Sequence, residues 1–301
     1  MIFLNASMGS LRDVGLAKRV EIVEIKDVVL YLDAGEPNEG RLSFAVSLAE
    51  RNGAALTGVC VWSEPPTDPA DCYAIGPEAV TDVLSRRDAE IARFLAPPEA
   101  AFRTAAVAGN IDCRWSVAGL NESPEQLALG ARCFDLAIVG RPVAREHVGQ
   151  KLAELIALFS GTPCLVISEQ PRPSVAFDRI VLAWNGSCEA KRALEDGLVF
   201  LKRAKSVRLI IVGGAEVEPV AQAAGDGVLR HLARHGVDAE LAHIEAPHED
   251  VGSTLLHQCD LYRADLLIMG AYGHSRAMEM VLGGATRTIL GHAPLPVMLS
   301  H

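Results

Sequence analysis

The sequence predicts an α/β protein built from two tandem doubly wound domains, each a parallel sheet covered by helices on both faces. Its length of 301 residues is about twice the roughly 150 residues of an ordinary domain. Half of the residues are hydrophobic, so each half can bury a core of its own. Short apolar runs alternate with helical segments, which is typical of parallel sheets. The same order of segments also occurs twice, at a spacing that indicates a duplicated domain.

Each segment of the first half has a counterpart in the second half. Every pair has similar length and patterning, and the fourth and last strands also match in sequence. The expected pairs are first strands 26–33 and 177–184, helices 41–51 and 189–202, second strands 55–62 and 206–212, third strands 112–117 and 239–245, fourth strands 134–140 and 264–270, and last segments 161–168 and 293–300.

The halves differ between their second and third strands. There the first half has a proline-rich loop over 63–70, then helices over 78–95 and 99–107 that Pro97 and Pro98 separate. The second half has one helix over 217–235, which we expect to break near Gly225.

A short proline-rich linker over 169–174 separates the halves. We therefore expect a first domain over 25–168 and a second over 177–301. Residues 1–24 have no counterpart in the second half and are interpreted as an extension.

Charge and composition exclude several classes of partner. The formal net charge is −10 and the acidic residues are dispersed, which argues against nucleic acid and anionic membranes. No run approaches the roughly 20 apolar residues of a membrane-spanning helix, and no signal-peptide core is present, so a cytoplasmic location is expected. The seven cysteines form no C-x-x-C pair and are expected to be reduced thiols, mostly in the core.

A glycine-rich segment in the second half predicts an anion site. Gly270 ends the apolar run 265–270 and Gly273 follows it; Gly283 and Gly284 come after nine intervening residues that include an expected helix over 276–282. Glycines at a strand-to-helix turn let the backbone approach a ligand, and free amides at a helix start attract anions. The alternative is that these glycines only shape turns and permit close helix packing.

The first half does not repeat this segment. Gly140 and Asp33 are retained, but Val143 takes the place of the second glycine, and Leu152 and Ala153 fall where Gly283 aligns. Side chains at these positions would block the approach of the backbone to a phosphate. The first half is therefore predicted to be a structural partner.

Other candidate sites are weaker. His231 and His235 are four residues apart on an expected helix and could hold a metal, but no third ligand has suitable spacing. A metal is equally weakly indicated by a second set, His243, His248 and His257. Cys188 at a helix start could be reactive, although Ser187 beside it is better interpreted as the helix cap. No hydrolase or kinase motif occurs, so no catalytic residue is assigned.

The second half resembles the universal stress protein domain, and the whole chain resembles its tandem form. Three features carry the resemblance, which covers residues 25–301: the spacing of Gly270, Gly273 and Gly283, the opening run 180–187, and the closing run 294–299. It implies a five-stranded parallel sheet of order 3-2-1-4-5 in each half. It also implies that the two last strands meet across a pseudo-two-fold axis, as in the homodimers of the family.

The resemblance also implies an adenine nucleotide site, for ATP or a related nucleotide. Adenine would pack near the ends of the first and second strands, and loop and helix amides with nearby hydroxyls would bind the phosphates. His274 or Arg276 could balance charge. The site residues implied are Ala183, Trp184, Asn185, Gly186, Val212, Gly270, Gly273, His274, Ser275, Gly283, Gly284, Ala285 and Thr286.

Two residues depart from the family pattern. Gly284 stands where ATP-binding members usually have Ser or Thr, and Asn185 where they often have Asp. An amide carries no charge for a metal, so a role for Mg²⁺ stays open.

Three functions follow as alternatives: a nucleotide-responsive stress protein, a scaffold that acts only by protein association, or a weak ATP hydrolase. The protein partner is not identified by the sequence, and a further homodimer of the tandem chain is compatible with it.

Overall fold

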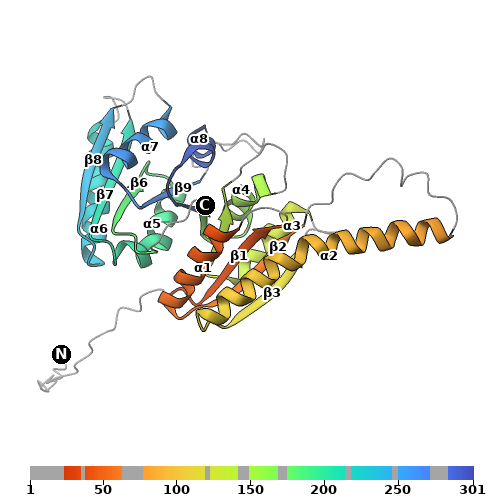
Figure 1. Cartoon of the computed structure of the whole chain (residues 1–301). Coiled ribbons are helices and arrows are strands. Elements are labelled where there is room, and N and C mark those ends of the chain that lie inside the picture. The colour runs from red at the N-terminus through yellow and green to blue at the C-terminus, as the bar shows by residue number, and fades with distance from the viewer. Residues whose placement is uncertain are drawn as a thin grey trace, which may run out of the picture.

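The two halves form one continuous ten-stranded sheet (Figure 1). The computed structural model describes residues 24–34, 38–62, 77–118, 123–141, 149–168, 175–213, 218–245, 250–271 and 284–301. Strands run through the middle of the molecule and helices cover both faces.

Strands and helices alternate in the first half as the apolar pattern predicts. Its strands are β1 (Asp27–Asp33), β2 (Ala55–Val61), β3 (Cys113–Ala118), β4 (Leu136–Gly140) and β5 (Cys164–Ile167). Its helices are α1 (Glu39–Asn52), α2 (Pro77–Ala108), α3 (Pro124–Gly130), the 3₁₀ turn η2 (Ala131–Cys133) and α4 (Gly149–Phe159).

The second half repeats this order. Its strands are β6 (Arg179–Ala183), β7 (Ser206–Gly213), β8 (Ala239–Glu245), β9 (Leu266–Gly270) and β10 (Val297–Ser300). Its helices are α5 (Cys188–Leu201), α6 (Glu218–Arg234), α7 (Val251–Tyr262) and α8 (Gly284–His292). The helix expected over 276–282 falls outside the residues that the structure describes.

The strand order is β3-β2-β1-β4-β5-β10-β9-β6-β7-β8. Within each half all pairings are parallel, and the predicted order 3-2-1-4-5 is confirmed. The halves meet where β5 and β10 pair antiparallel, with Leu165 opposite Met298. Without this pairing each strand would be an uncovered apolar edge of its own sheet, so the pairing covers both edges at once.

Two apolar layers cover the two faces of the sheet, and each layer spans both halves. We call the face under α1, α2, α5 and α6 the α5 face, and the face under α3, α4, α7 and α8 the α8 face. On the α5 face Phe177 lies between Phe44 of the first half and Phe200 of the second, with ring centroids 6.0 and 5.4 Å away. The two halves therefore share a core as well as a sheet.

Two predicted helix interruptions are wrong. α2 is continuous through Pro97 and Pro98, and in Figure 1 its N-terminal part extends beyond the sheet. Arg93 and Phe94, whose carbonyls lose their helical donors to the prolines, are exposed, so water can bond those carbonyls. α6 continues through Gly225, where an added Cβ would lie 2.8 Å from Leu241 Cδ2. Gly225 therefore permits close packing of α6 on β8.

Among the helices that the structure describes, none is both long enough and apolar enough to span a membrane. The six cysteines in this part of the chain are all unpaired, and Cys60, Cys164 and Cys259 are buried.

Candidate functional site

The carboxyl ends of β6 and β9 form the switch point of the second half. The chain continues from β6 through β7 to β8 on one side, and then returns to β9 and β10 on the other. In doubly wound sheets this crevice is the usual ligand site. α7 and α8 both begin at this edge, because α7 follows β8 and α8 follows β9 in the chain.

Four predicted site residues cannot be placed. Gly273, His274, Ser275 and Gly283 lie in the segment 272–283, outside the described residues. The same holds for Arg276 and for Val143 of the first half. The described remainder of the site consists of the ends of β6, β7 and β9 and the start of α8.

The sheet separates Ala183 from Trp184, although both were expected to pack near one adenine. Ala183 and Val212 pack against the core of the α8 face, whereas Trp184 packs against the core of the α5 face. Neighbouring residues of a strand point to opposite faces, so Ala183 and Trp184 cannot line one side of a ligand. A ligand at the start of α8 would face Ala183 and Val212 and would be shielded from Trp184 by the sheet.

The turn after β6 is held by its own side chains. Gly186 has φ +77°, a left-handed conformation that favours glycine. Asn185 Oδ1 accepts a hydrogen bond from Ser187 N at 3.1 Å, and Ser187 Oγ accepts one from Ala190 N at 3.1 Å. Ser187 is thus the cap of α5, as predicted, and Cys188 is the exposed first residue of that helix.

Gly270 is covered by the first turn of α5. An ideal Cβ on Gly270 would lie 2.5 Å from both Ala190 N and Glu189 C, far inside any real contact distance. This glycine therefore lets the helix start pack onto the strand end, on the α5 face. Of the two interpretations of the glycines, close packing is the one that applies to Gly270.

The start of α8 is open by comparison. Gly284 is exposed, and an ideal Cβ there has only Asp250 Oδ1 nearby, at 3.8 Å. The first amides of a helix have no partner within it and attract anions. Thr286 is buried in the same turn, with 3% of its surface exposed. Gly284 and Ala285 thus keep backbone amides at an accessible helix start on the α8 face.

Asp250 is a residue of this edge that sequence reasoning missed. Its Oδ2 caps α7 by accepting from Ser253 N at 2.9 Å and from Ser253 Oγ at 3.2 Å. α7 and α8 begin in close contact, because a Cβ on Gly252 would lie 2.8 Å from Ala285 O. Partial burial acts to raise the pKa of Asp250, but hydrogen bonds from Ser253, Thr288 and Gly252 outweigh it and lower the pKa. A carboxylate therefore sits beside the anion-attracting start of α8.

In the first half the space beside Gly140, the counterpart of Gly270, is filled by an arginine. Arg41 is 3% exposed, and its guanidinium donates to Tyr31 O at 2.8 Å, Asp33 Oδ2 at 2.9 Å and Asn38 Oδ1 at 2.9 Å. An ideal Cβ on Gly140 would lie 2.6 Å from Arg41 Cζ.

Arg41 is the third residue of α1, and Ala190, which covers Gly270, is the third residue of α5. Leu152 and Ala153 are buried core residues. The space beside Gly140 in the first half is thus occupied by the side chain of Arg41.

The histidine candidates form no metal site in the described part of the chain. The rings of His231 and His235 lie 4.7 Å apart, and His231 Nε2 lies 3.3 Å from Glu195 Oε1. His243 lies in β8 and His257 in α7, while His248 is outside the described residues. No group of three suitable ligands occurs among the described residues.

The fold defines a tandem α/β protein of the open, doubly wound kind, with a switch point at the strand ends of its second half. Comparison with known proteins agrees with this class. Residues 176–301 match the sequence profile of the Universal stress protein family. The second half is thus similar to this family in sequence, and the solved structures below show that the whole chain shares its tandem α/β fold.

Several relatives illustrate this similarity. A universal stress protein of Synechocystis is 26% identical over 175 residues, which cover 55% of this chain and 57% of the relative. The chain thus matches little more than half of that relative's length. A universal stress protein of Thermus aquaticus is 28% identical over 137 residues, covering 41% of this chain and 98% of the relative.

Solved structures match the fold over nearly the whole chain. A universal stress protein from Archaeoglobus fulgidus is 15% identical, with a TM-score of 0.65, and the match covers 91% of this chain and 97% of the other. A protein from Pseudomonas aeruginosa described as a putative universal stress protein is 14% identical, with a TM-score of 0.59 and coverage of 92% and 93%.

Proposed function

We propose that this chain is a stress-response protein whose second half binds one adenine nucleotide, ATP or a relative of it. The observation that carries the proposal is the exposed start of α8 at the switch point, on the same face as Ala183 and Val212. The free amides there would receive phosphate oxygens, and the two apolar side chains would contact the base. Binding would change the affinity of the chain for a protein partner.

The spacing of Gly270, Gly273 and Gly283 supports the same site. Gly273 and Gly283 bring no Cβ to the segment between β9 and α8, as a phosphate cradle requires, whereas Gly270 allows α5 to pack. The first half supports a single site by contrast, because Val143 takes the place of Gly273 there. Arg41 fills the space beside Gly140 on the α5 face, the opposite face from the proposed site.

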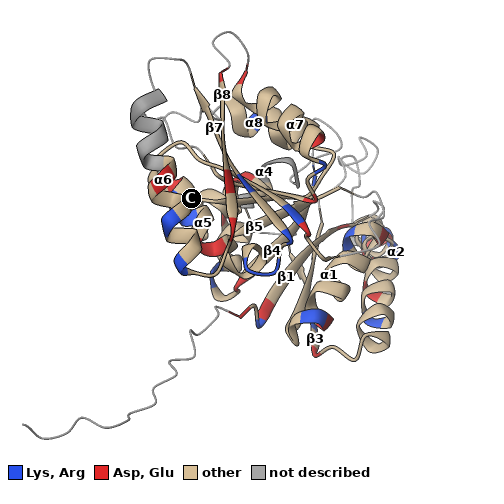
Figure 2. Ribbon diagram, turned by 90° about the vertical axis from the view of Figure 1, so that its left-hand side faces the viewer, with Lys and Arg blue, Asp and Glu red and all other residues tan. Residues whose placement is uncertain are grey.

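A scaffold that binds no nucleotide is the second candidate. The carboxylate of Asp250 beside the start of α8 favours it, since a fixed negative charge opposes a phosphate. On that account the chain would act only by association with other proteins. Figure 2 shows basic and acidic residues dispersed over the helices and strands of both halves.

Calorimetric titration of ATP, ADP and AMP, with and without Mg²⁺, tests the proposal on protein freed of nucleotide by unfolding and refolding. The variant Gly273→Val copies Val143 of the first half and is expected to abolish binding. Gly291→Val is the matched control, because an added Cβ there has no atom within 4 Å. No binding by the wild-type protein at millimolar nucleotide would reject the nucleotide site and leave the scaffold.

A further inference from the structure

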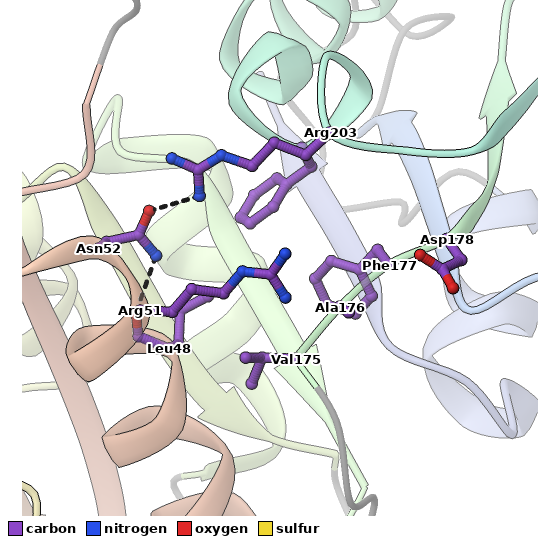
Figure 3. Close-up of a pocket in the computed structure, with 9 residues that line it drawn as sticks. Leu48, Arg51, Asn52, Val175, Ala176, Phe177, Asp178 and Arg203 are labelled. Atoms are coloured by element: carbon purple, nitrogen blue, oxygen red, sulfur yellow. Dashed lines mark hydrogen bonds between the residues drawn. The ribbon is translucent and has the colours of Figure 1, made fainter.

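A second pocket lies at the junction of the two halves, away from the start of α8 (Figure 3). It is formed by the last turn of α1, the stretch that leads into β6, and the end of α5. The pocket lies at the amino end of β6, whereas the proposed nucleotide site lies at the carboxyl end of that strand.

Two arginines from different halves face this pocket. In Figure 3 the side chain of Arg51, from α1, extends toward Ala176 and Phe177, and that of Arg203, just after α5, is directed toward Asn52. Arg203 Nη1 donates to Asn52 Oδ1 at 2.7 Å, which links the two halves through a neutral group. Among the described residues neither arginine has a carboxylate partner.

The two lysines nearby, in contrast to the arginines, are paired with carboxylates. Lys205 Nζ lies 2.6 Å from Asp178 Oδ2, and Lys26 Nζ lies 2.9 Å from Glu24 Oε2. Lys26 also contacts Asn52 O at 3.5 Å, so all four cations surround the end of α1 and the start of β6. Four cations thus lie near the pocket, two of them paired with carboxylates, and one of these carboxylates, Asp178, lines the pocket itself.

The floor of the pocket strengthens the attraction for an anion. Leu48, Phe177 and Phe200 line it and are buried, and the two aromatic rings meet edge to face. Charges interact more strongly next to an apolar wall than in open water. Planar guanidinium groups also match the geometry of oxyanions.

The size of the pocket limits what it can hold. The enclosed space is ≈ 20 Å³, about the room that one water-sized group occupies. Only the oxygen atoms of an anionic head group fit, with the remainder of the ligand in solvent. A whole nucleotide does not fit.

We propose that the junction binds the head group of an oxyanion, a carboxylate or a phosphate, between Arg51 and Arg203. Such a ligand would bridge the two halves through Arg51 of the first half and Arg203 of the second. An alternative explanation of the arginines is that they only complement the negative ends of α1 and α5. That explanation requires no ligand.

The test is the melting temperature of the full chain in phosphate, in acetate and in chloride at equal ionic strength. We expect phosphate or acetate at tens of millimolar to raise Tm by about 2 °C over chloride, and Arg51→Gln and Arg203→Gln each to abolish the rise. Arg114→Gln, at an exposed arginine of β3, is the matched control and should keep it.

Arg51→Gln is the more informative variant, because Arg51 makes no hydrogen bond or ion pair with the described residues and the fold should be unaffected. Calorimetric titration of phosphate into wild type, Arg51→Gln and Gly273→Val separates this pocket from the α8 site. Loss of binding in Arg51→Gln with retention in Gly273→Val supports the junction site. Equal Tm in all three salts, or an oxyanion response that Arg51→Gln retains, would overturn it.

Discussion

Single side chains distinguish the strand-end crevices of the two halves. Arg41 fills the crevice of the first half, whereas in the second half the third residue of the helix is Ala190 and the helix backbone covers Gly270 instead. At the start of α8 the decisive residue is Asp250, which contributes a negative charge where a phosphate is proposed to bind.

Replacing Asp250 by Asn is expected to raise the affinity for ATP about 3- to 10-fold, since one repulsive charge near the phosphates is removed. Asn is also a good helix cap, so α7 should stay intact. Calorimetric titration measures the change, and Asp260→Asn, at an exposed position in the last turn of α7, is the control. Unchanged or weaker binding in Asp250→Asn would show that this carboxylate does not oppose the nucleotide.

Arg41→Ala should destabilise the protein by about 3 kcal/mol. The substitution removes three hydrogen bonds and leaves Asp33 without its buried partner. Urea unfolding measures the loss, and Arg114→Ala should change the free energy of unfolding by no more than about 0.5 kcal/mol. A cost as small as that of the control would mean that the guanidinium merely occupies the crevice.

At the scale of elements, the strands could be predicted from the sequence because each is a short apolar run between turn residues. β8 begins and ends at the predicted residues. For the other strands, most ends lie within two residues of the predicted ones. The predictions of breaks in α2 and α6 were wrong because they rested on the residue types proline and glycine and not on what surrounds these residues in the fold. α2 tolerates Pro97 and Pro98 because the carbonyls that lose their donors are exposed. α6 requires Gly225 because it packs closely on β8.

Parts of the site could also have been found. Ala183 and Trp184 are neighbours in a strand, so strand geometry alone places them on opposite faces. Arg41 lies in phase with the apolar residues Ala45 and Leu48 of α1, which is a signal for a buried charge. The approach of Asp250 to Gly284 depends on how α7 packs on α8, and no local pattern encodes it.

The packing of α5 on β9 gives a prediction at this scale. Gly270→Ala should cost about 2–3 kcal/mol, because its Cβ would overlap backbone atoms of Glu189 and Ala190 that have little freedom to shift. Gly284→Ala is the matched control and should stay within about 0.5 kcal/mol, since its Cβ meets nothing closer than 3.8 Å. Equal values for the two variants in urea unfolding would contradict the packing role of Gly270.

For the whole molecule, the antiparallel pairing of β5 with β10 joins two parallel sheets into one. The resemblance had implied that the last strands meet, and this expectation is confirmed. The shared apolar layers on both faces make the halves parts of one core.

A separate second half, residues 175–301, would expose the edge of β10. All four residues of this strand are buried in the full chain. The fragment is therefore expected to form a homodimer through β10, because an uncovered apolar edge pairs with another strand. Light scattering after size-exclusion chromatography measures its mass, and a folded monomer would contradict this role of the edge.

The central claim is that two similar halves provide one nucleotide site, and counting bound ligands tests it most directly. Native mass spectrometry of nucleotide-free protein in excess ATP counts the ligands bound to each chain. The structure predicts one ATP per chain, lost in Gly273→Val and retained in Arg41→Ala. Two ATP per chain would contradict the role of the first half as a structural partner, and none would contradict the site at the start of α8.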